Sequence, residues 1–195
     1  MSNSFPPRAE HPADIEILLE GLASVVEDRT ATYVSSPLTT GQAAFEWHLR
    51  NGDRSDPDGA KDFYESVIVP NRQQAAAYVR ALRKARGAVI DPTAMGDLPG
   101  WTQPDYRYFW GRVIELYANE VVHRDGWQHS SGCAYEFFVA LQSGASTLRE
   151  DLTPLSLEDG QELVRAAVEE CEARGVSAEF LRGVVGALGE LAATR

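Results

Sequence analysis

Cysteine, basic charge and long apolar runs are all scarce in this 195-residue chain, and each shortage excludes a class of protein. The two cysteines, Cys133 and Cys171, are too few for a disulfide scaffold and lack the paired spacing of a zinc site. The 18 Lys and Arg residues are outnumbered by 29 Asp and Glu residues, which gives a net charge of −11. Because binding to a nucleic-acid polymer depends on clustered basic residues, we expect no such partner.

Membrane insertion and export also lack their usual signals. No apolar run approaches the roughly 20 residues that a membrane-spanning helix needs, so we expect no membrane partner. Residues 1–12 are polar and proline-rich without the apolar core of a secretory signal, and we predict a flexible N-terminal arm there. With both cysteines read as free thiols, the expected location is the cytoplasm. The 44% hydrophobic and 24% charged residues are typical of a globular domain.

Strand-like and helix-like segments alternate along most of the chain. Short β-branched or apolar runs predict strands near residues 30–34, 88–91, 120–123 and 145–148. Apolar residues at helical spacing predict helices near 13–28, 42–49, 71–86, 106–117 and 132–142. This alternation indicates β-α-β units, so we predict an α/β fold: a compact parallel sheet flanked by helices, flavodoxin-like or Rossmann-like.

Two segments have specific boundary signals. Residues 51–62 are rich in Asn, Gly, Asp and Pro, and we expect them to form a surface loop. The helix at 71–86 is rich in strong helix formers, and we expect it to begin with Asn71 as N-cap and to stop at Gly87.

The C-terminal quarter differs from the alternating part. Residues 151–195 carry two segments of helical apolar spacing separated by Gly175. They predict a helical hairpin that packs on an α/β domain formed by residues 13–150. This hairpin could also be the interface of an assembly scaffold, which is one alternative for the function.

The segment 123–136, HRDGWQHSSGCAYE, concentrates polar side chains after a predicted strand, where ligands bind in open parallel sheets. If Ser130 or Ser131 caps the next helix, the N–H of Gly132 points into the crevice and a phosphate or carboxylate could bind there. The serines could equally serve as caps without a ligand. Glu136 lies beyond the capping-box position at the edge of the apolar arc, either held beside the core or exposed to solvent.

Two further chemistries are open to the same segment. His123, Asp125 and His129 are metal-binding residue types, but the histidines are six residues apart and no third His completes a set. We therefore expect no metal and no other cofactor. A dyad of Cys133 with His129 is conceivable, although Cys133 falls on the apolar arc and is better explained by packing.

Three segments together resemble the nucleoside 2-deoxyribosyltransferase-like superfamily. They are YVSSPLT after the first strand, VIDP after the second and GWQHSSGCAYE after the third. The pattern Y-x-x-x-P followed by G-W-x-x-S-x-G-x-x-x-E is similar to that of small bacterial and phage members, and the resemblance covers residues 30–148. It implies a compact parallel α/β sandwich that cleaves or transfers the N-glycosidic bond of nucleosides or nucleoside monophosphates.

The resemblance also implies a role for individual residues. Glu136 would be the nucleophile that forms a glycosyl-enzyme intermediate, with Tyr33 close to it and to the sugar. Ser130 would bind a phosphate or 5′-hydroxyl group at the helix N-terminus, and Trp127 would line the pocket and stack on a base. We add further substrate-binding residues from the same loops: Ser131, Gly132, Pro37, Asp91 and Asp125.

The expected pocket is nucleoside-sized and bounded by loops 35–41, 91–100 and 123–132. The expected partner is a small-molecule nucleoside or nucleotide. A homo-oligomer is also expected, because members of the superfamily often complete the pocket with a neighbouring chain. The alternative is a nucleotide-binding or sensing module that kept the fold without the chemistry.

Some positions depart from the pattern of active relatives. Gly111 or Arg112 stands where an Asp assists catalysis, and Asn119 replaces an Asp at the start of the third strand. Thr39 stands where the nucleotide-hydrolysing branch has an arginine in the first loop. Three carboxylates could substitute for the missing ones: Asp105, Glu115 and Asp125.

Overall fold

The sheet of the protein is parallel and has four strands. The structure, a computed structural model, describes residues 5, 7–52, 54 and 56–194. Its strands are β1 (Ala31–Ser35), β2 (Val89–Ile90), β3 (Ala118–His123) and β4 (Ser146–Arg149), in the order β2-β1-β3-β4. This order matches the first four strands of the flavodoxin-like order 2-1-3-4-5. The predicted α/β fold with a parallel sheet is confirmed.

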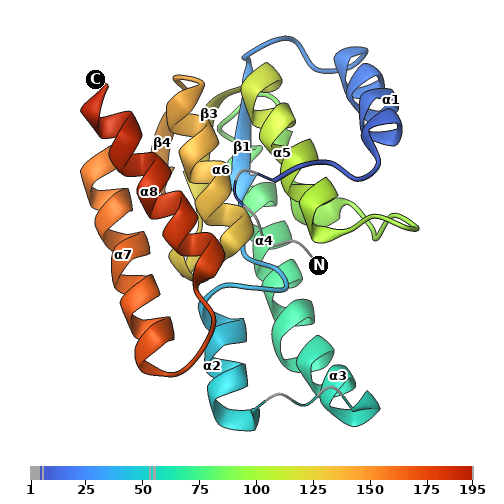
Figure 1. Cartoon of the computed structure of the whole chain (residues 1–195). Coiled ribbons are helices and arrows are strands. Elements are labelled where there is room, and N and C mark those ends of the chain that lie inside the picture. Colours follow the sequence, from blue (N-terminus) through green and yellow to red (C-terminus); the bar gives the residue numbers. More distant parts are fainter. Residues whose placement is uncertain (1–4, 6, 53, 55, 195) are drawn as a thin grey trace.

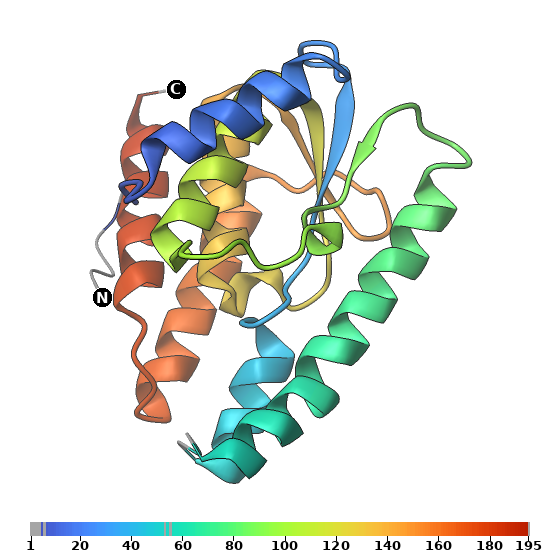
Figure 2. The same ribbon diagram turned by 90° about the vertical axis from the view of Figure 1, so that its right-hand side faces the viewer.

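Helices cover both faces of the sheet (Figure 1, Figure 2). One face carries α4 (Val69–Leu82), whereas the other carries α5 (Gln103–Tyr117) and α6 (Ser131–Gln142). The N-terminal helix α1 (Pro12–Ala23) packs against α5. In the described part of the chain, no helix combines the length and the apolarity that crossing a membrane requires.

Side chains that alternate along the central strand β1 build both cores. Val34 is buried with Val79 of α4, whereas Tyr33 is buried with Val139 of α6. Because successive side chains of a strand point to opposite faces, Ser35 shares the face of Tyr33. Strand β1 therefore presents two hydroxyl groups toward α6.

The C-terminal segment forms the predicted helical hairpin, made of α7 (Leu157–Ala173) and α8 (Glu179–Ala193) (Figure 1). Gly175 in the connection has a φ of 72°, a left-handed conformation that favours glycine. The hairpin packs on α6 around the fully buried ring of Phe137. Gly160 of α7 lies so close to this ring that a Cβ atom there would be 2.1 Å from a ring carbon.

The loop expected at residues 51–62 is only partly a loop. A helix, α3 (Pro57–Phe63), begins within it, and the Asp56 side chain accepts a hydrogen bond from the first turn. A π-helical turn (Tyr64–Ile68) joins α3 directly to α4, just before Pro70, which lacks the N–H for a regular helical bond. The loop prediction is wrong from Pro57 onward because Asp followed by Pro is also the start signal of a helix.

Asn71 therefore lies inside α4 and is not its N-cap, and α4 ends at Leu82 rather than near Gly87. The Asn71 side chain donates to the Leu38 carbonyl oxygen over 3.1 Å. This bond anchors the loop between β1 and α2 (Gln42–Asn51) to α4.

The flexible arm predicted at residues 1–12 stays a prediction, and its described part contacts the domain. Phe5 makes edge-to-face contacts with three rings of α6 and α8, at centroid distances of 5.6 to 5.9 Å. These rings belong to Tyr135, Phe138 and Phe180. Residues 1–4 and 6 lie outside the described residues.

The contact between Gly160 and Phe137 gives a test of the hairpin packing. We expect Gly160→Ala to lower the free energy of unfolding by about 1–3 kcal/mol, because the methyl group overlaps a buried ring. The matched control is Gly186→Ala in α8, where a Cβ atom would meet nothing within 4 Å. The control should raise stability by about 0.5–1 kcal/mol. Urea denaturation measures both, and equal effects of the two substitutions would refute the packing.

Candidate active site

The candidate site lies at the carboxyl ends of the strands, where the connections of the chain diverge. From β1 the chain crosses to β2 on one side, whereas β3 leads to β4 on the other side. Ligands of open parallel sheets bind at such a switch point. A cleft of about 150 Å³ is lined there by the loops after β1 and β2, by α5 and by the N-terminus of α6. All three expected loops contribute: 35–41, 91–100 and, through Ser130 and Gly132, 123–132. Helix α5 is a further wall that the sequence did not indicate.

Glu136 of α6 is the buried carboxylate of this cleft. Its side chain lines the cleft, and the residue is only 8% exposed. Its Oε1 accepts a hydrogen bond from the Tyr33 hydroxyl over 2.8 Å, and its Oε2 accepts one from the Ser35 hydroxyl over 2.6 Å. The carboxylate is therefore held beside the core, and both of its oxygens are oriented by strand β1.

The surroundings of Glu136 shift its titration. Burial raises its pKa to about 7, and the hydrogen bonds from Ser35 and Tyr33 oppose this rise. Burial and the neighbouring Glu136 carboxylate raise the pKa of Tyr33 well above its usual value. The phenol therefore stays protonated and remains a donor to Glu136.

Ser35 was not among the residues singled out in the sequence. It lies two residues after Tyr33 in a strand, so both side chains point to the same face. That spacing is the signal that could have identified it once Tyr33 was placed beside Glu136.

The start of α6 forms one end of the cleft. Ser130 is the N-cap, since its Oγ accepts from the Cys133 N–H over 3.3 Å. Its hydroxyl also shares a hydrogen bond of 2.7 Å with the Thr40 hydroxyl. Gly132 lines the cleft, and its N–H belongs to the first turn, where no intrahelical acceptor exists. The helix cap at Ser130 is therefore present and Gly132 lies beside the cleft, whereas anion binding there stays a prediction.

Arg107 of α5 is a second side chain that sequence reasoning missed. It lines the cleft, is 8% exposed, and donates from Nη2 to the Ser131 hydroxyl over 2.8 Å. Its guanidinium lies 4.2 Å from the ring centroid of Phe180. Burial lowers the pKa of this guanidinium. No local pattern in the sequence distinguishes Arg107 from Arg112, the other arginine of α5.

The structure places five expected substrate-binding residues outside the lining of this cleft. Trp127 is 4% exposed and packs against His123 and Phe137, because a left-handed Gly126 turns the short 3-10 helix (Trp127–His129) toward the core. The other four line separate depressions of the surface. Pro37 and Asp125 line one beside Arg124 and Glu150, and Asp91 lines another, where it caps the turn that begins at Pro92. Ser131 likewise faces a neighbouring groove.

The structure does not bring together the residues of a possible metal site or of a Cys133–His129 dyad. His123 is buried between aromatic rings, where burial lowers its pKa to about 3. The imidazole of His129 contacts Glu170 over 3.0 Å, and Asp125 is exposed. Burial raises the pKa of the Cys133 thiol to about 12, which leaves no thiolate for a dyad. Within the described residues, no group of three or more His, Cys, Asp or Glu side chains is arranged to hold a metal ion.

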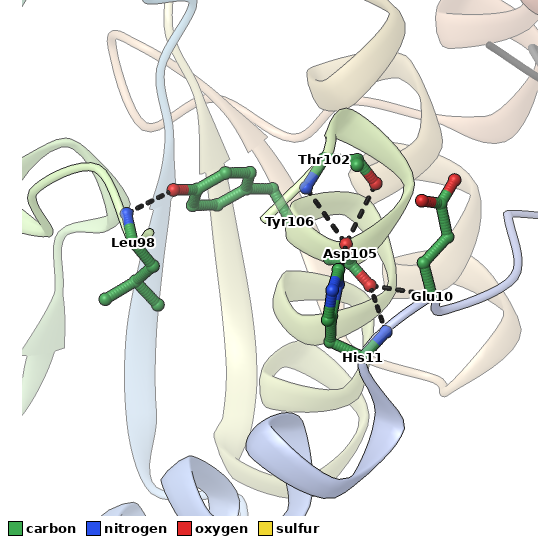
Figure 3. A network of polar contacts seen from close by, with 6 residues as sticks. All are labelled: Glu10, His11, Leu98, Thr102, Asp105 and Tyr106. Carbon is green, nitrogen blue, oxygen red and sulfur yellow. Dashed lines mark hydrogen bonds and ion pairs between the residues drawn. The ribbon is translucent and has the colours of Figure 1, made fainter. Parts of the chain in front are cut away.

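Asp105, one of the carboxylates that could substitute for the missing catalytic Asp, has a structural role at the start of α5. This carboxylate is fully buried and accepts hydrogen bonds from the N–H groups of Glu10 and His11, and from Thr102 (Figure 3). It thus caps α5 and fastens the end of the N-terminal arm to it. Next to it, Tyr106 accepts from the Leu98 N–H over 2.7 Å, which ties the loop after β2 to the cleft wall.

The structure also places the other residues at which the sequence departs from the pattern of active relatives. Glu115 forms an ion pair with Arg112 and does not line the cleft. Asn119 lies exposed at the amino end of β3, the edge of the sheet opposite the site. Gly111 lets α5 approach α6, since a Cβ atom there would lie 3.0 Å from the Tyr135 ring. Thr39 lines the cleft.

Comparisons of the chain with protein-family models, with curated proteins and with solved structures found no match. The class that fold and site define is thus a parallel α/β protein with a buried carboxylate in a cleft at the switch point of its sheet. The superfamily resemblance stays a prediction that rests on the motif residues.

Glu136 should make stability depend on pH. Burial raises the pKa of Glu136 from 4.5 to about 7, so the folded state favours the protonated carboxyl. The free energy of unfolding is therefore highest below pH 4.5 and falls as the pH rises through 7. At pH 8 the cost is on the order of 3 kcal/mol. We therefore expect Glu136→Gln to raise the melting temperature by several degrees at pH 8 and by little at pH 4.5.

The control for this measurement is Glu169→Gln, at an exposed position of α7. It should change the melting temperature little at either pH. A Glu136→Gln effect that is the same at pH 4.5 and pH 8 would contradict the raised pKa.

Proposed function

We propose that the protein acts on the N-glycosidic bond of a nucleoside or nucleotide, either hydrolysing it or transferring the sugar to another base. Glu136 is the nucleophile. The observation that carries the proposal is the buried Glu136 carboxylate on the cleft wall, oriented by hydrogen bonds from Tyr33 and Ser35. Tyr33 and Glu136 are 103 residues apart in sequence, and the superfamily resemblance also implies that they lie close together.

The reaction proceeds in two displacements. A carboxylate oxygen of Glu136 forms a bond to the anomeric carbon, while the bond from that carbon to the base nitrogen breaks and the base leaves with the electron pair and takes up a proton from water. Water, or the nitrogen of a second base, then attacks the anomeric carbon and displaces the carboxylate, and the proton that this nucleophile loses neutralises the hydroxide left by the first step. The two hydroxyl donors hold the carboxylate in the attacking orientation and stabilise it again when it leaves.

The cleft offers suitable surroundings for a nucleoside. Tyr106 and Trp110 line it and present aromatic surfaces on which a base can stack, the role expected of Trp127. Asp97 is the other carboxylate of its lining among the described residues, and it comes from the loop after β2. It is the candidate for contacts to the base or to the sugar hydroxyls.

A non-catalytic nucleotide-binding or sensing role is the second candidate. It is favoured by the positions of Asp105, Glu115 and Asp125, none of which lines the cleft. Exposed Asp97 is then the sole partner carboxylate for Glu136 among the described lining residues. Saturable nucleotide binding without base release would favour this second candidate.

Base release tests the proposal directly. We expect the protein to liberate free base from at least one member of a panel of ribo- and deoxyribonucleosides and their 5′-monophosphates. Glu136→Gln should lower kcat/KM by at least roughly 1,000-fold, because the neutral amide cannot form the covalent intermediate. Glu169→Gln is the control with unchanged activity. Base release that survives in Glu136→Gln would rule out the nucleophile.

The pH profile supplies an independent check. Since Glu136 must be ionised to attack, we expect kcat/KM to fall below an apparent pKa of about 7. Ser35→Ala removes a hydrogen bond that lowers the pKa of Glu136, so the acidic limb should move to higher pH. A limb near 4.5, or one that Ser35→Ala leaves in place, would be incompatible with this assignment.

A further inference from the structure

Arg107 is a buried cation that has no carboxylate partner in the described part of the chain. The residue is 8% exposed, and no Asp or Glu among the described residues forms an ion pair with it. Its Nε is buried and has no hydrogen-bond partner in the described part of the chain. Burying a charge without a partner is costly, and proteins therefore pair buried charges. Within the described residues, Arg107 therefore has no carboxylate to balance its charge.

Two contacts engage part of the Arg107 guanidinium beside the cleft. One face of the guanidinium lies over the Phe180 ring, and Nη2 is engaged by the Ser131 hydroxyl. A guanidinium has five N–H groups in one plane, so donors remain for an acceptor in the cleft that Arg107 lines. Ser131 is also the first residue of α6, which places the cation beside the N-terminus of that helix.

The N-terminus of α6 adds a second attraction for negative charge. Gly132 lines the cleft, and its first-turn N–H and the helix dipole both favour an anion there. A Cβ atom at Gly132 would meet only the Ser130 Oγ, at 3.8 Å, so packing does not demand a glycine at this position. The missing side chain instead keeps the helix N-terminus open to the cleft.

We propose that Arg107 and the N-terminus of α6 bind an anionic group of the ligand, and that Arg107 thereby gives the cleft its preference for a nucleoside 5′-monophosphate over the nucleoside. This inference deepens the proposed function and rests on its nucleoside-like ligand. Arg107 forms no ion pair with Glu136, although both line the same cleft. One end of the ligand can thus be held as an anion while the carboxylate remains available for the sugar.

Binding is measured by calorimetry in the Glu136→Gln background, so that no turnover occurs. The ligands are a panel of nucleosides, the matched 5′-monophosphates and inorganic phosphate. We expect at least one monophosphate to bind at least about 10-fold more tightly than its nucleoside, and phosphate to compete with it. Arg107→Met, which keeps an apolar stem over Phe180, should remove this preference and change nucleoside affinity less than about 3-fold.

Two further variants make the test specific. Arg112→Met changes an arginine of the same helix that is paired with Glu115, and it should keep the preference. Gly132→Ala places a methyl group at the helix N-terminus and should weaken monophosphate binding at least about 10-fold with little change for nucleosides. This second variant decides the question if Arg107→Met does not fold.

The outcomes separate this inference from the proposed function. Equal affinity of the parent for every nucleoside and its monophosphate overturns the anion site, as does a preference that survives both Arg107→Met and Gly132→Ala. An Arg107-dependent preference without base release by the wild type supports the anion site and refutes the glycosidase proposal. Base release from nucleosides and monophosphates alike, unaffected by Arg107→Met, does the reverse.

Discussion

The hydrogen bonds that join Glu136 to Tyr33 and Ser35 are the constraint on which the site depends. They connect a helix to the central strand of the sheet and hold a carboxylate where water is largely excluded. A buried carboxylate costs stability, and this cost persists because two hydroxyl donors compensate only part of it. A buried ionisable group that lowers stability in this way is typical of functional sites.

The rest of the molecule brings further groups to that carboxylate. Helix α5 contributes Arg107 and Trp110 to the cleft, and the carboxylate of Asp105 fixes the start of this helix and attaches the N-terminal arm to it. The C-terminal hairpin contributes through Phe180, which covers the guanidinium. The hairpin and the arm, which lie outside the sheet, thus support one wall of the site.

Much of the fold could be predicted because it follows from local patterns. The alternation of strand-like and helix-like segments indicates the parallel sheet. The position of Glu136 at the edge of the apolar arc of its helix left burial and exposure to solvent both open. Other residues depend on contacts between distant elements. Trp127 turns inward because of a left-handed Gly126, and the role of Arg107 requires knowing how α5 is rotated against α8. Asp56 and Pro57 start a helix rather than continue a loop, and the sequence does not separate the two because the same pair occurs in turns and at helix starts.

The most direct measurement is the titration of the Glu136 side-chain carboxyl carbon by NMR, assigned through its loss in Glu136→Gln. The account predicts a midpoint of about 7, because the carboxylate is buried and its two donors offset only part of the effect. A midpoint near 4.5 would contradict it, since such a value belongs to a carboxylate in contact with solvent.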